Sequence, residues 1–68
     1  MNKTIVDTYG QIKGIVTYQG NDENSHGTGI DRMGNVIGHY IPGSNLTMDN
    51  NGNRIGTGNL LEALVKMS

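Results

Sequence analysis

The stretch Asp31-Arg-Met-Gly34-Asn-Val-Ile-Gly38 carries a pattern, Asp-x-x-Gly-x-x-x-Gly, that occurs three times in this chain of 68 residues. The other copies run from Asp7 to Gly14 and from Asp49 to Gly56. Asp at the first position of a type I turn accepts hydrogen bonds from amides two or three residues on, and Gly can take the positive φ that follows. We therefore predict three related β-hairpins, with structural turn residues Asp7, Gly10, Asp31, Gly34, Asp49 and Gly52.

The second glycine of each copy falls inside a predicted strand. Gly within a strand usually marks a β-bulge or a place where another group lies close to the backbone. The residues between the turns favour strands, over residues 4–6, 11–18, 28–30, 35–41, 46–48 and 53–57. Because consecutive strands joined by short turns pair antiparallel, we predict a mainly β fold: one antiparallel meander of five or six short strands.

The pattern changes after residue 58. Asn59 followed by Glu62 resembles a capping box, and apolar residues then recur at helical spacing, at Leu60, Leu61, Leu64, Val65 and Met67. We expect one short C-terminal α-helix over about residues 59–67, within a single domain over residues 1–68. Such a helix is about 14 Å long, whereas six strands span about 24 Å. The helix is therefore too short to cover one face of the sheet.

The strand predicted over residues 35–41 is apolar on both sides. Simple alternation points Val36 and Tyr40 to one face and Ile37, His39 and Ile41 to the other. Strands that are apolar on both sides are normally buried on both sides. A chain this short, with no cysteine, also lacks a disulfide to supplement a small core. We therefore expect a homo-oligomer, a dimer or higher, with an interface at Val36, Ile37, Tyr40, Ile41, Leu60, Leu61, Leu64 and Val65.

Charged residues are few and dispersed. Six acidic and five basic side chains give a formal net charge of −1, and the basic residues are isolated from one another. Nucleic-acid binding depends on clustered Lys and Arg, so we expect no nucleic-acid partner. The N-terminal stretch reaches Asp7 too soon for a signal peptide, and no apolar run approaches transmembrane length. We expect a cytoplasmic protein without a membrane partner.

Three features suggest chemistry, and each has a simpler interpretation. His26 and His39 lack an evident nucleophile, orienting carboxylate and oxyanion hole. The last repeat superficially resembles a calcium loop, but Gly58 stands where a bidentate Glu belongs. Gly56 and Gly58 match the start of a dinucleotide fingerprint, but Leu61 occupies the place of its third glycine. We therefore expect no enzyme activity, no bound metal and no cofactor.

The second and third copies share the fuller form Asp-x-x-Gly-Asn-x-Ile-Gly. This form resembles the YD/Rhs-type β-hairpin repeats and, with Gly58-Asn-Leu-Leu61, short bacterial proteins built from a few such hairpins. The resemblance covers about residues 28–64, although Ile30 and Met48 stand where the YD repeat has a Tyr-Asp pair. It implies a hairpin fold and a bacterial or mobile-element origin, and it transfers no catalytic residue.

Two functions follow from these observations. The first is a non-enzymatic structural or interaction protein that self-associates through its sheet face and its C-terminal helix. The alternative is a small ligand- or carbohydrate-binding module that stacks its ligand on surface tyrosines, at Tyr9, Tyr18 and Tyr40. These tyrosines occupy three different positions of the repeat, which counts against a regular aromatic surface.

Overall fold

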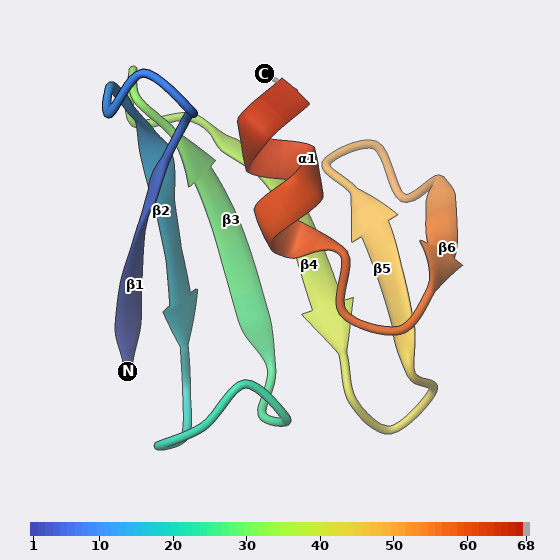
Figure 1. Cartoon of the computed structure of the whole chain (residues 1–68). Coiled ribbons are helices and arrows are strands. Elements are labelled where there is room, and N and C mark those ends of the chain that lie inside the picture. The colour runs from blue at the N-terminus through green and yellow to red at the C-terminus, as the bar shows by residue number, and fades with distance from the viewer. Residues whose placement is uncertain (68) are drawn as a thin grey trace.

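The computed structural model describes residues 1–67, in which one six-stranded sheet packs against one helix (Figure 1). Strand order follows chain order, and every neighbouring pair is antiparallel. The prediction of a mainly β meander with a short C-terminal helix is thus confirmed; residue 68 of the predicted domain lies outside the described residues. The elements are β1 (Asn2–Val6), β2 (Ile12–Tyr18), β3 (Gly27–Asp31), β4 (Val36–Ile41), β5 (Leu46–Asp49), β6 (Arg54–Thr57) and α1 (Leu61–Met67).

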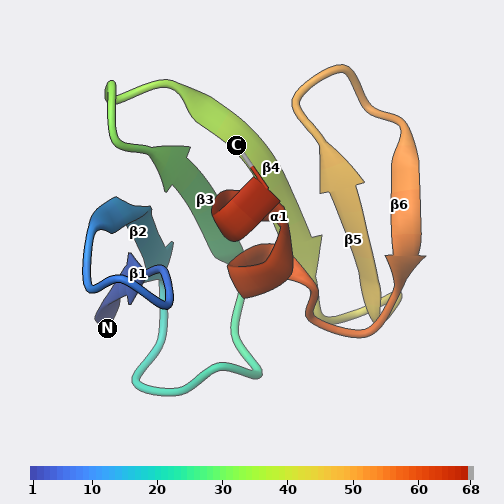
Figure 2. The same ribbon diagram turned by 45° about the horizontal axis from the view of Figure 1, so that its top comes forward.

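The three repeats form three hairpins that share one irregularity. In each hairpin the residue just before the second glycine has no partner on the opposite strand. In the middle hairpin, for example, Gly29 pairs with Gly38 and Ile30 pairs with Val36, so that Ile37 is the extra residue. Such a β-bulge bends its strand and increases the local twist. The sheet accordingly curls, and α1 lies between its β1–β2 end and its β5–β6 end (Figure 2).

The bulge corrects the predicted facing of two residues in β4. Val36 pairs with Ile30 and faces away from α1, whereas Ile37 packs against the buried cluster beneath α1. Simple alternation, which ignores the bulge, places Val36 on the same face as Tyr40 and Ile37 on the other face, so both of these predictions were wrong. Tyr40 faces α1 and is buried, and His39 and Ile41 share the other face, so beyond the bulge the alternation is as predicted.

The second glycine lies under α1 in the first two repeats, and in the third it lies against Leu60, the residue just before the helix. A Cβ added to Gly38 would lie 2.5 Å from Leu64 Cδ2, and a Cβ added to Gly56 would lie 2.7 Å from Leu60 Cδ1. Gly14 is also confined, because an added Cβ would collide with the carbonyl oxygen of Ile30 and lie 2.9 Å from a methyl group of Val65. The absence of side chains at these positions lets the helix approach the sheet closely. The core beside them consists of Ile5, Val16, Tyr18, Tyr40, Leu61 and Val65.

Candidate functional site

The three turn carboxylates are occupied by backbone hydrogen bonds. Asp31 Oδ1 accepts from the amides of Met33 and Asn35, both at 2.9 Å, and Asp7 and Asp49 do the same at their own turns. Each Asp side chain therefore accepts hydrogen bonds from the amides two and four residues later, whereas the sequence analysis expected donors two or three residues later. The amide of the turn glycine donates to the Asp carbonyl, and that glycine has φ between 79° and 87°. These carboxylates are committed to turn geometry.

Hydrogen bonds from these amides also hold the pKa of two turn carboxyls below the usual value of 3.8. For Asp31 the largest contribution comes from the amide of Asn35, followed by that of Met33 among the stabilising bonds. For Asp49 the corresponding donors are the amides of Asn53 and Asn51. Both groups therefore stay ionised to lower pH than a free aspartate. Their ionisation stabilises a turn and leaves no free acid for catalysis.

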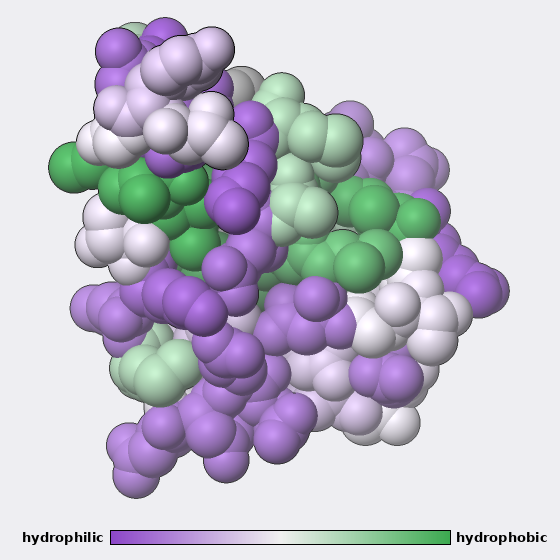
Figure 3. Space-filling model, viewed as in Figure 1, coloured by the Kyte–Doolittle hydropathy of each residue, from purple (hydrophilic) through white to green (hydrophobic). Residues whose placement is uncertain are grey.

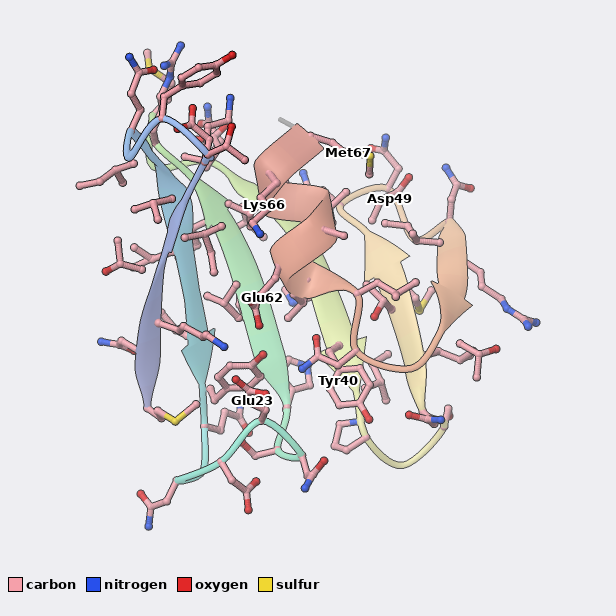
Figure 4. The ribbon with its side chains drawn as sticks, viewed as in Figure 1. Glu23, Tyr40, Asp49, Glu62, Lys66 and Met67 are labelled. Atoms are coloured by element: carbon pink, nitrogen blue, oxygen red, sulfur yellow. The ribbon has the colours of Figure 1, made fainter. Side chains whose placement is uncertain are left out.

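Lys3 joins three segments that are far apart in the sequence. Its Nζ lies 2.7 Å from Glu23 Oε1 in the β2–β3 loop and 2.8 Å from Glu62 Oε2 in the first turn of α1. Figure 4 labels both glutamates. The hydrogen bonds to Glu23 and then Glu62 raise the pKa of Lys3 above its usual value. Glu62 thus pairs with Lys3 instead of completing the capping box. Asn59 Oδ1 still accepts from the amide of Leu61, at 3.2 Å.

Thr47 is a buried polar residue that the sequence analysis missed. It lies in β5 beneath the chain that connects β6 to α1, and its side chain is fully buried. Its hydroxyl donates to the carbonyl of Gly58 at 2.6 Å and accepts from the amide of Leu60 at 2.9 Å. A threonine in a strand carries no signal of this role, because both partners are more than ten positions away along the chain.

The three tyrosines form no common surface. Tyr18 and Tyr40 are buried in the core, where the hydroxyl of Tyr40 donates to Asn45 and that of Tyr18 accepts from Asn59. Burial raises the pKa of Tyr18 above its usual value, although the bond from Asn59 opposes this effect. Tyr9 lies in the first turn and is 88% exposed. A stacking surface that uses all three rings has no counterpart in the structure.

Most of the predicted interface residues lie inside the chain's own core. Tyr40, Leu61 and Val65 are buried, and Ile37 and Leu64 pack against them. Leu60 is half-buried above Gly56. The apolar side of α1 is therefore packed against the chain's own sheet. From the predicted set, Val36 and Ile41 lie on the opposite face of the sheet.

The face of the sheet opposite α1 carries a row of aliphatic side chains. Val6 pairs with Ile12, and Ile15, Ile30 and Val36 stand side by side across β2, β3 and β4. We call these five residues the aliphatic row. Within residues 1–67, α1 is the element that packs across the sheet, and it lies on the other face. Val6, Ile12 and Val36 are accordingly exposed.

The helix side looks different. Figure 3 views this side, and its apolar surface appears as separate areas divided by hydrophilic residues. The exposed side of α1 carries Ala63, Lys66 and Met67, and the acidic residues Glu23 and Glu62 stand beside its first turn. The helix side of the molecule thus has a surface of both apolar and charged residues, whereas the opposite face of the sheet carries the aliphatic row.

A hollow of about 330 Å³ is lined by residues of β4 and β5, by the β5–β6 turn and by His26, which directly precedes β3. Two histidines share its wall, with ring centres 5.7 Å apart and ring planes inclined by 43°. Thr28 Oγ1 lies 3.4 Å from His39 Nδ1, whereas His26 Nδ1 is buried without a hydrogen-bond partner in the described chain. The lining residues are His26, His39, Ile41, Met48, Asp49, Asn50 and Gly52.

The described residues contain no cluster of three or more His, Cys, Asp or Glu side chains. In the same part of the chain, no helix has the length and apolar character needed to cross a membrane. No protein-family model, curated protein or solved structure matches this chain. The candidate site therefore rests on the geometry of the chain itself: the aliphatic row and the neighbouring hollow.

Proposed function

We propose that this chain is a small, non-enzymatic structural or interaction protein of the cytoplasm that self-associates through the sheet face opposite α1. The observation that carries the proposal is the aliphatic row, in which β-branched side chains from four adjacent strands stand together without a covering element in residues 1–67. Sheets of this kind bury such a face by packing against a second sheet about 10 Å away. The occupant is a second copy of this chain.

The size of the face supports a homo-oligomer. A stable protein–protein interface buries about 800 Å² on each partner. The two largest dimensions of this chain are 33 and 26 Å, so one broad face offers an area of that order. Burial of this face would also add to the apolar area removed from water, which is small in a chain of this length. The helix takes no part in this interface, in contrast to the sequence-based expectation, because its apolar side is already covered.

The experiment compares two substitutions at equally exposed positions. Val36, in the aliphatic row, and Ile55, the bulge residue of β6, are each 37% exposed. We expect Val36→Glu to convert the assembly to a 7.3 kDa monomer in sedimentation velocity, whereas Ile55→Glu leaves it assembled. Circular dichroism of both variants checks that the sheet is retained. A wild-type chain that stays monomeric at millimolar concentration would refute the proposal.

A further inference from the structure

Three side chains that can ligate a soft metal ion meet on the face opposite α1. His39 in β4 is the cross-strand partner of Met48 in β5. His26 directly precedes β3, and because Gly27 pairs with Tyr40, it stands diagonally across from His39. All three line the hollow described above. The fold therefore assembles two imidazoles and one thioether from positions that are 9 to 22 residues apart in the sequence.

The separation of the two rings suits a shared metal ion. An ion bound about 2 Å from one nitrogen of each ring would hold the ring centres roughly 5 to 6 Å apart, for bond angles between tetrahedral and linear. The observed separation is 5.7 Å. Packed ring pairs also have centres about 4.5 to 7 Å apart, so the separation permits a shared ion and the donor atoms must supply the reason for one.

The surroundings of the two rings match the needs of ligating histidines. A ligating histidine usually has its second ring nitrogen held by a neighbouring polar group, and Thr28 Oγ1 stands 3.4 Å from Nδ1 of His39. This arrangement leaves Nε2 of His39 for an ion. His26 Nδ1 is buried and lacks a partner in the described chain. An unpartnered buried polar atom requires an explanation, and an ion bound to Nδ1 itself would supply one.

The available donors select the kind of ion. Asp49 also lines the hollow, but its carboxylate oxygens already accept from Asn51 and Asn53, so no free carboxylate favours a hard cation. Imidazole and thioether donors are neutral; imidazole suits several transition metals, and the soft thioether favours Cu(I) over zinc or magnesium. We propose that His26, His39 and Met48 form a site for one soft monovalent cation of the Cu(I) type.

The test uses Ag⁺, a monovalent ion that undergoes no redox change here, added as silver nitrate in chloride-free buffer. NMR follows the ring protons of the histidines and the methyl groups of the methionines. We expect one equivalent to shift both histidines and Met48, and to leave the exposed Met33 and Met67 unmoved. The titration is repeated on Val36→Glu, so that its outcome is independent of self-association.

Affinities of two matched variants complete the test. Met48→Leu conserves side-chain volume and should lower the Ag⁺ affinity by about tenfold or more, whereas Met33→Leu should leave it unchanged. His26→Asn serves as a second variant and should cause a similar loss. Three results would overturn the proposal: equal affinity of the wild-type chain and Met48→Leu, shifts at Met33 and Met67 instead of Met48, or Zn²⁺ bound as tightly as Ag⁺.

Discussion

The two faces of the sheet are both apolar, yet they are built from opposite kinds of residue. The face under α1 presents glycine at four positions where helix side chains come close, Gly14, Gly27, Gly29 and Gly38, and at Gly56 beneath Leu60. The other face presents Ile and Val at neighbouring positions, in the aliphatic row. A face of glycines is shaped to receive a helix at short distance, whereas a face of branched side chains is shaped to interdigitate with another such face. The glycine face is filled within the chain, and the branched face is not.

The largest contrast between the faces should appear when an apolar side chain is truncated. Leu61 is fully buried between α1 and the sheet, so Leu61→Ala should lower the free energy of unfolding by about 3 kcal/mol. Ile12 is apolar but 58% exposed on the other face, so Ile12→Ala should change it by less than about 0.5 kcal/mol. Urea denaturation at a concentration where the chain is monomeric measures both. Equal losses would show that the two faces are equally buried in the monomer.

A smaller effect is expected from adding a methyl group to the glycine face. Gly38→Ala places a Cβ 2.5 Å from Leu64 and 2.7 Å from the carbonyl oxygen of Met48, so we expect a loss of about 2 kcal/mol from overpacking. Gly43→Ala is the matched control, because a Cβ there meets nothing within 4 Å. Thermal unfolding of the two variants compares them. A Gly38→Ala variant as stable as Gly43→Ala would mean that α1 does not rest on this strand.

The smallest effect concerns the turns that connect neighbouring strands. The folded-state pKa values of Asp31 and Asp49 lie below the usual 3.8, so both carboxylates stabilise the fold above that pH. This stabilisation is lost as the pH falls through the lowered folded-state pKa values, because these carboxylates bind protons more readily in the unfolded chain than in the folded one. We expect the melting temperature to decline below about pH 4, and the double variant Asp31→Asn, Asp49→Asn to show a shallower decline. An unchanged pH profile in that variant would contradict the assignment.

The sequence predicted the hairpins well because each turn is a local structure. The bonds to the Asp side chain reach only to the fourth following residue, and the positive φ belongs to the glycine of the same turn. The predicted strands lie within one or two residues of the observed ones. The helix begins at Leu61 rather than residue 59, because Asn59 acts as a capping residue outside it.

The contacts that form the candidate sites could not be predicted from the sequence, because they join residues that are far apart along the chain. Lys3 meets glutamates 20 and 59 positions away, and Thr47 bonds to groups 11 and 13 positions away. The meeting of His26 with His39 depends on the register of β3 against β4. None of these pairs leaves a periodic signal, because each results from the way separate hairpins are placed beside one another.

The amino-acid sequence by itself determined three hairpins, their turns and a C-terminal helix, since these depend on residues within a few positions of each other. The tertiary structure alone decided which apolar face is covered. A bulge of one residue moves Val36 to the open face and Ile37 to the core, because side chains alternate with a period of two. The docking of α1 over Gly14, Gly29 and Gly38 then covers one face across β1 to β4. The aliphatic row is what remains on the other.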